Sequence, residues 1–116
     1  MNNISTSGEK IRIDTIDAFV KKNEIKTIDF IKCDVEGFEY FVFKGGLKSI
    51  REFKPIIFSE IQKKWYSRYG KKNAFDLLEG EGYVPHIYDS KLKKLIRVSG
   101  ISEQNEDYFF IPSASQ

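Results

Sequence analysis

The sequence has 116 residues, a length that suits a single small domain. Its net charge is +2, and basic and acidic residues are interspersed, which excludes an electrostatic argument for binding nucleic acid or an anionic membrane. The single cysteine excludes an internal disulfide and a cysteine-based zinc site. Neither a signal peptide nor an apolar run of membrane-spanning length is visible, so we expect a cytoplasmic protein.

Residues 1–9 are small and polar, and we expect them to form a flexible N-terminal tail. Residues 10–112 should form one domain, and residues 113–116 a second flexible tail. The domain begins with a short strand at 10–13 and a short helix. Asp14 can cap that helix, and Asp17 lies in its first turn, where an acid favours the positive end of the helix dipole.

The most informative stretch begins with the short apolar run Ile28–Cys33, which predicts a strand buried on both faces. Asp34 and Glu36 follow this run, and Gly37 marks a sharp turn. In open α/β sheets, ligands bind outside the carboxyl ends of the strands. The two acids therefore lie where an α/β protein is expected to have its site.

Beyond Gly37 the apolar residues recur at spacings of three and four, which predicts one amphipathic helix. This helix should end near Phe53, because Pro55 disfavours helical geometry in the residue before it. Gly45 and Gly46 lie within the predicted helix. They indicate either a close contact with a neighbouring element or a kink.

The run 56–61 predicts a second strand, parallel to the first through a right-handed βαβ unit. Glu60 is then expected near Asp34 and Glu36, at the same edge of the sheet. A loop with some helical character should follow at 62–72. The later elements are expected to be a helix at 74–81, strands at 83–88 and 92–98 joined by a turn, and a final strand at 107–111.

The pair formed by Asp34 and Glu36 has two interpretations. Converging carboxylates can act as an acid or base or can bind a hard cation. Alternatively, Asp34 caps the following helix and Glu36 is only solvated. Lys32 shares a face of the strand with Asp34, so we expect an ion pair between them rather than a catalytic amine. Cys33 and His86, the only histidine, are expected to be structural.

With these elements placed, the sequence resembles the FkbM family of S-adenosylmethionine-dependent methyltransferases. The most specific part of the resemblance is the string D-F-I-K-x-D-V-E-G, which here spans Asp29–Gly37. The other matching segments are Thr15–Phe19, Phe38–Glu39, Val42–Gly45, Lys54–Glu60, Gly82–Tyr83 and Asn105–Ile111.

The resemblance implies an α/β fold with a partial Rossmann-like methyltransferase sheet, mostly parallel with an antiparallel edge hairpin. It implies S-adenosylmethionine as the cofactor, near Asp34, Val35 and Gly37, and catalytic roles for Asp34, Glu36 and Glu60. The glycine-rich cofactor loop of the family has no counterpart in this sequence. We therefore expect the C-terminal half of such an enzyme, acting on a hydroxyl of a sugar or other small metabolite.

Two other functions stay open. The chain could be a non-catalytic half-domain that pairs with another chain or with itself through an exposed sheet edge, since an uncovered edge strand invites pairing. It could also be a metal-dependent sugar transferase that uses Asp34 and Glu36, although no nucleotide-sugar pattern accompanies the acids.

Overall fold

The computed structural model describes residues 3–6, 9–12, 15–35, 37–66 and 73–113. Two strands, β1 (Asn3–Thr6) and β2 (Glu9–Arg12), form a separate antiparallel sheet. Strand β1 lies within the residues expected as a flexible tail, whereas β2 matches the strand expected at 10–13. No helix in the described part of the chain is long and apolar enough to cross a membrane.

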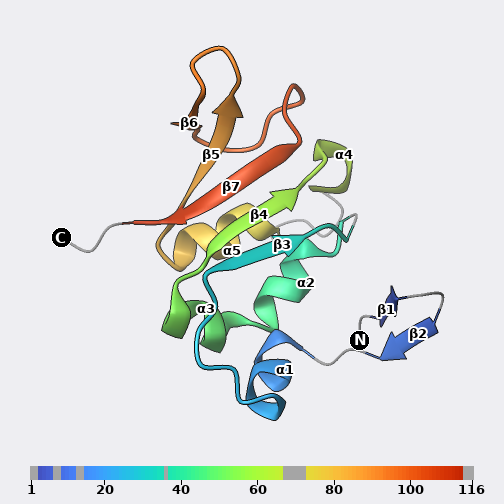
Figure 1. The fold of residues 1–116 in the computed structure, drawn as a ribbon. Coiled ribbons are helices and arrows are strands. Elements are labelled where there is room, and N and C mark those ends of the chain that lie inside the picture. Colours follow the sequence, from blue (N-terminus) through green and yellow to red (C-terminus); the bar gives the residue numbers. More distant parts are fainter. Residues whose placement is uncertain (1–2, 7–8, 13–14, 36, 67–72, 114–116) are drawn as a thin grey trace.

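The main sheet has five strands in the order β3-β4-β7-β5-β6 (Figure 1). Their bounds are β3 (Phe30–Cys33), β4 (Ile56–Glu60), β5 (Tyr83–Asp89), β6 (Lys94–Arg97) and β7 (Asp107–Pro112). The helices are α1 (Ile16–Lys22), α2 (Glu39–Lys44), α3 (Leu47–Phe53), α4 (Lys63–Tyr66) and α5 (Ala74–Gly80). An α/β fold was predicted and is confirmed.

The prediction of a mostly parallel sheet is wrong. Only the pair β3–β4 is parallel, and the other three pairings are antiparallel. The reason is the position of β7, which inserts between β4 and β5 and runs opposite to both. Strands β3, β4 and β5 therefore point the same way although only two of them pair directly. The antiparallel β5–β6 hairpin at the edge was predicted and is confirmed.

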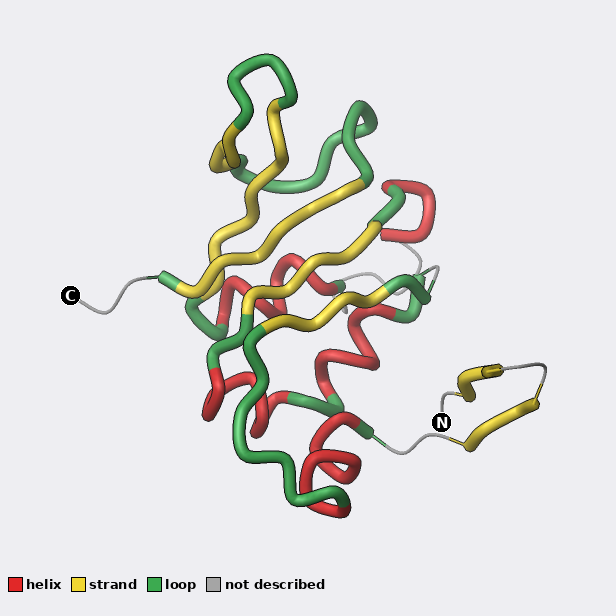
Figure 2. The backbone as a smooth tube through the Cα atoms, in the orientation of Figure 1, coloured by secondary structure: helices red, strands yellow, loops and turns green. Residues whose placement is uncertain are grey.

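The helices α2, α3 and α5 lie on one face of the sheet (Figures 1 and 2), and the hydrophobic core lies between them and that face. Ile57 and Phe110 supply the centre of the sheet side, and both are fully buried. Phe43 and Phe75 cover them from α2 and α5. We call this side the covered face of the sheet.

The opposite side, which we call the open face, carries Phe30, Lys32, Ile56, Phe58 and Phe109. Phe30 is 51% exposed and Ile56 is 40% exposed. The rings of Phe58 and Phe109 lie 4.7 Å apart and are half-buried. The strand Ile28–Cys33 was expected to be buried on both faces, and that expectation is wrong, because no described helix covers the open face.

The single helix expected between Gly37 and Phe53 is two helices, α2 and α3, which meet at Gly45 and Gly46. A Cβ atom added at Gly46 would lie 2.9 Å from two side-chain atoms of Ile16, and one at Gly45 would lie 2.9 Å from Thr15. Both expected features of the glycine pair, a close contact and a break, are therefore present. The contact positions α1 against the start of α3.

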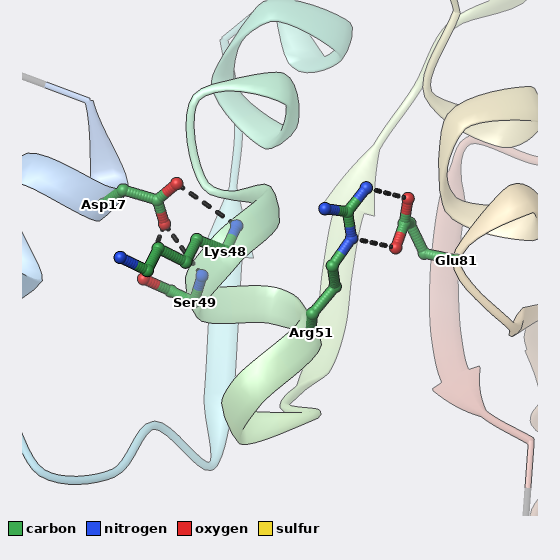
Figure 3. Close-up of polar contacts among 5 residues, drawn as sticks. All are labelled: Asp17, Lys48, Ser49, Arg51 and Glu81. Atoms are coloured by element: carbon green, nitrogen blue, oxygen red, sulfur yellow. Dashed lines mark hydrogen bonds and ion pairs between the residues drawn. The ribbon is translucent and has the colours of Figure 1, made fainter.

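Asp17 reinforces this junction (Figure 3). Its carboxylate accepts hydrogen bonds from the backbone N–H groups of Lys48 and Ser49, at 3.2 and 2.8 Å, and from the Ser49 hydroxyl at 2.7 Å. Asp17 therefore caps α3 rather than its own helix, whose N-cap is Thr15. Asp14, the cap predicted for α1, lies outside the described residues.

Replacement of Gly46 by alanine tests the close contact. We expect the free energy of unfolding to fall by about 1–3 kcal/mol, because the added methyl group overpacks against Ile16. Gly80→Ala is the matched control, since a Cβ atom there has no neighbour within 4 Å. Urea denaturation should show a loss for Gly46→Ala only. Equal effects at the two glycines would contradict the packing argument.

Candidate functional site

The turn between β3 and α2 carries the residues that the sequence singled out. Strand β3 ends at Cys33, Asp34 is exposed, and Val35 is half-buried against the core. The Phe38 amide donates to the Val35 carbonyl at 3.3 Å, which closes the turn. Gly37 has a φ of 99°, a conformation that glycine adopts without strain. The predicted strand–turn–helix arrangement is present, and Glu36 lies outside the described residues.

Glu60 lies beside this turn, as its position at the end of β4 predicts. Cys33 pairs with Ser59 in the parallel ladder, so the next residues of the two strands, Asp34 and Glu60, emerge at the same edge. The pKa of Glu60 is raised, first by a hydrogen bond with Glu106 and further by partial burial and the negative charges of Asp34, Asp107 and Glu106. Asp34 and Glu60 are therefore brought together.

Two acids near Glu60 were missed in the sequence. Asp107 pairs directly with Glu60 across the β4–β7 ladder, and the Glu106 carbonyl accepts a hydrogen bond from the Ile61 amide at 2.7 Å. Neither could be placed here without knowing that β7 lies next to β4. No group of three or more His, Cys, Asp or Glu side chains among the described residues has metal-binding geometry.

The raised pKa of Glu60 predicts a pH-dependent stability. Since the folded state binds the proton of Glu60 more tightly than the unfolded state, stability falls as the pH rises above the ordinary value of 4.5. Glu60→Gln removes this loss, so we expect the variant to unfold at a higher temperature than the wild type at pH 7. The difference between their unfolding temperatures should shrink below pH 4.5. Thermal unfolding followed by circular dichroism measures it, with the exposed Glu103→Gln as control. A gain that grows on acidification would contradict the assignment.

Lys32 and Cys33 differ in their outcomes. The expected ion pair between Lys32 and Asp34 is not formed. Lys32 is exposed on the open face, next to its strand partner Phe58. An exposed lysine needs no partner.

Cys33 is buried, as predicted, and its burial and the nearby Glu39 carboxylate raise its pKa to about 12. Its thiol is therefore protonated and unsuited to nucleophilic attack.

Glu39 is a further residue that the sequence analysis missed. Only 4% of it is exposed, and both carboxylate oxygens lie 3.1 Å from the Gly37 amide nitrogen. It is the first residue of α2 and lies one helical turn before the buried Phe43. The spacing of four could have revealed it, because residues i and i+4 share a helix face.

Two surface depressions lie away from the turn. One, of about 590 Å³, is bordered by residues of β5 and β6, including Tyr83 and Arg97. The other, of about 550 Å³, lies between α1 and α3. Neither is lined by Asp34 or Glu60, and the second contains Asp17, whose carboxylate already caps α3. Neither depression is therefore part of the candidate site, which is assigned from the turn and its acids.

Comparison with known proteins identifies the family. The sequence profile described as "Methyltransferase FkbM domain" matches residues 5–87, well over half of the chain, and covers the turn and both parallel strands. No curated protein and no solved structure matches the chain significantly. The family implies S-adenosylmethionine as the methyl donor. The chain therefore belongs to the FkbM methyltransferase family.

Proposed function

We propose that the chain is an S-adenosylmethionine-dependent O-methyltransferase whose active site contains the carboxylates at the turn between β3 and α2. The acceptor is a hydroxyl group of a sugar or other small metabolite. The observation that carries the proposal is the exposed carboxylate of Asp34 at the carboxyl end of β3, next to Glu60, within the region that matches the family. Strand ends of this kind are the usual ligand-binding edge of α/β sheets.

The polar groups of the turn fit part of the cofactor. S-adenosylmethionine presents amino and hydroxyl groups, which are hydrogen-bond donors, and the exposed Asp34 carboxylate is a strong acceptor. Val35 and Gly37 would contribute backbone groups, and Gly37 has no side chain to obstruct a close approach. The bound cofactor would supply an electrophilic methyl group on its sulfonium.

The carboxylates would orient the acceptor hydroxyl and take its proton. Asp34 would accept a hydrogen bond from the acceptor hydroxyl, orient that hydroxyl, and take its proton when the oxygen is methylated. Glu60 would be a second carboxylate at the same edge, and its pKa is raised by the hydrogen bond with Glu106 and by the neighbouring acids. Glu36 is proposed for the same role from its place in the sequence.

A labelling experiment tests the reaction class. The folded chain is incubated with S-adenosylmethionine carrying a trideuterated methyl group and a panel of monosaccharides and small hydroxylated metabolites, and products are identified by mass spectrometry. We expect a trideuteromethyl ether of one acceptor class. Transfer to nitrogen or carbon only, or no transfer from a chain shown to be folded, would contradict the proposal.

Self-association is a second proposal, favoured by the outer edge of β3, with which no other described strand pairs. The Ile56 amide donates to the Asp29 carbonyl, so Asp29 faces β4, and by alternation the backbone groups of Phe30 and Lys32 point away from the sheet. We propose that this edge pairs with a second chain. Lys32→Pro removes one outward N–H and should leave the β4 ladder intact.

Light scattering on a concentration series tests the pairing. The wild type is expected to gain mass with concentration, and Lys32→Pro is expected to stay monomeric. A wild type that is monomeric at high concentration would contradict the proposal.

A further inference from the structure

Glu39 is the only acidic residue that is buried in the described part of the chain. It forms no ion pair with any described Lys, Arg or His, and the ion pair between Arg51 and Glu81 lies elsewhere (Figure 3). Burial of a carboxylate without a cation disfavours folding unless hydrogen bonds compensate. The position at the start of α2 compensates in part, because the helix dipole favours an acid there.

The remaining compensation comes from the turn itself. The Gly37 amide donates to both oxygens of Glu39, at 3.1 Å each, so the carboxylate is centred on this one N–H. Hydrogen bonds to an ionised acceptor are stronger than neutral ones. Gly37 has a positive φ, a conformation that an unrestrained chain would leave easily. The contact therefore fixes the backbone at Gly37, three residues after Asp34.

We propose that Glu39 is a positioning residue, whose buried carboxylate holds the backbone of Gly37 and thereby keeps the turn between β3 and α2 in the conformation that presents Asp34 to its ligand. This inference rests on the proposed function for the ligand and on the Gly37 contact for the geometry. Glu39 would not touch the ligand, because only 4% of it is exposed.

The first test needs no ligand. Amide hydrogen exchange and ¹H–¹⁵N chemical shifts of Gly37 are measured in the wild type, Glu39→Ala, Glu39→Gln and the exposed control Glu52→Gln. We expect faster exchange and an upfield amide proton in Glu39→Ala, and near wild-type exchange in Glu39→Gln, which keeps an acceptor oxygen. A Gly37 amide that is unchanged in Glu39→Ala would overturn the inference. If Glu39→Ala does not fold, a changed Gly37 shift in the folded Glu39→Gln supports it and an identical shift overturns it.

The second test uses S-adenosylhomocysteine as the probe. We expect Glu39→Ala to weaken its binding by about tenfold, the loss that corresponds to one charge-assisted hydrogen bond. In a double-mutant cycle, Asp34→Asn should cost little more in the Glu39→Ala background, because Glu39 acts through Asp34. Additive losses would overturn the inference, since a purely structural role would leave the Asp34 contribution intact. If the wild type does not bind the probe, the proposed function fails, and the Gly37 exchange still decides the positioning role.

Discussion

Replacement of Asp34 by asparagine is expected to lower the rate of methyl transfer by about 10²- to 10⁴-fold, the usual contribution of a general base. The asparagine amide still fills the exposed position at the end of β3, so the fold should be kept, but it cannot take the hydroxyl proton. The rate is measured as formation of S-adenosylhomocysteine with the acceptor identified by labelling.

Asp29→Asn is the matched control for this prediction. Asp29 precedes the same strand, its side chain is exposed, and its contact with β4 uses its backbone carbonyl, which the substitution leaves in place. We expect its rate to equal that of the wild type. A loss below tenfold in a folded Asp34→Asn variant would remove the catalytic role of Asp34.

Replacement of Phe110 by alanine is expected to lower the free energy of unfolding by about 3–5 kcal/mol. Phe110 is fully buried on the covered face, where its ring lies 5.1 Å from that of Phe75. The helices α2 and α5 are fixed by the core around it, so the cavity can close only in part. For a domain of this size, such a loss approaches the whole stability.

The neighbouring residue in the same strand is the control. Phe109 lies on the open face, where it is half-buried and contacts Phe58 at 4.7 Å. We expect Phe109→Ala to cost about 1–2 kcal/mol. Urea denaturation of both variants measures the difference between the two faces. Equal costs would mean that the open face is covered in solution, contrary to the fold described above.

The sequence predicted local structure well because local patterns determine it. Apolar runs and turn residues predict the strands around Ile31 and Ile57, their parallel pairing, and the edge hairpin. The long helix was predicted from a continuous apolar stripe. The stripe is real, since Phe43 and Ile50 are both buried, but it spans two helices separated at Gly45.

What the sequence could not predict depends on contacts between distant segments. The insertion of β7 between β4 and β5 places Asp107 beside Glu60, and no local pattern encodes it. The exposure of Phe30 depends on which elements cover the sheet, so an apolar strand was wrongly expected to be buried on both faces. Glu39 was overlooked because an acid near a helix start is usually solvated. The catalytic and cofactor-binding roles of Asp34 and Gly37 stay predictions.

A titration with S-adenosylhomocysteine followed by ¹H–¹⁵N chemical shifts tests the central claim most directly, because it detects weak binding and locates it by residue. We predict shift changes concentrated at the amides from Asp34 to Phe38 and at Glu60, reduced in Asp34→Asn and unchanged in Asp29→Asn. No shift changes, or changes confined to the depression beside β5 and β6, would contradict the assignment of the cofactor to this turn.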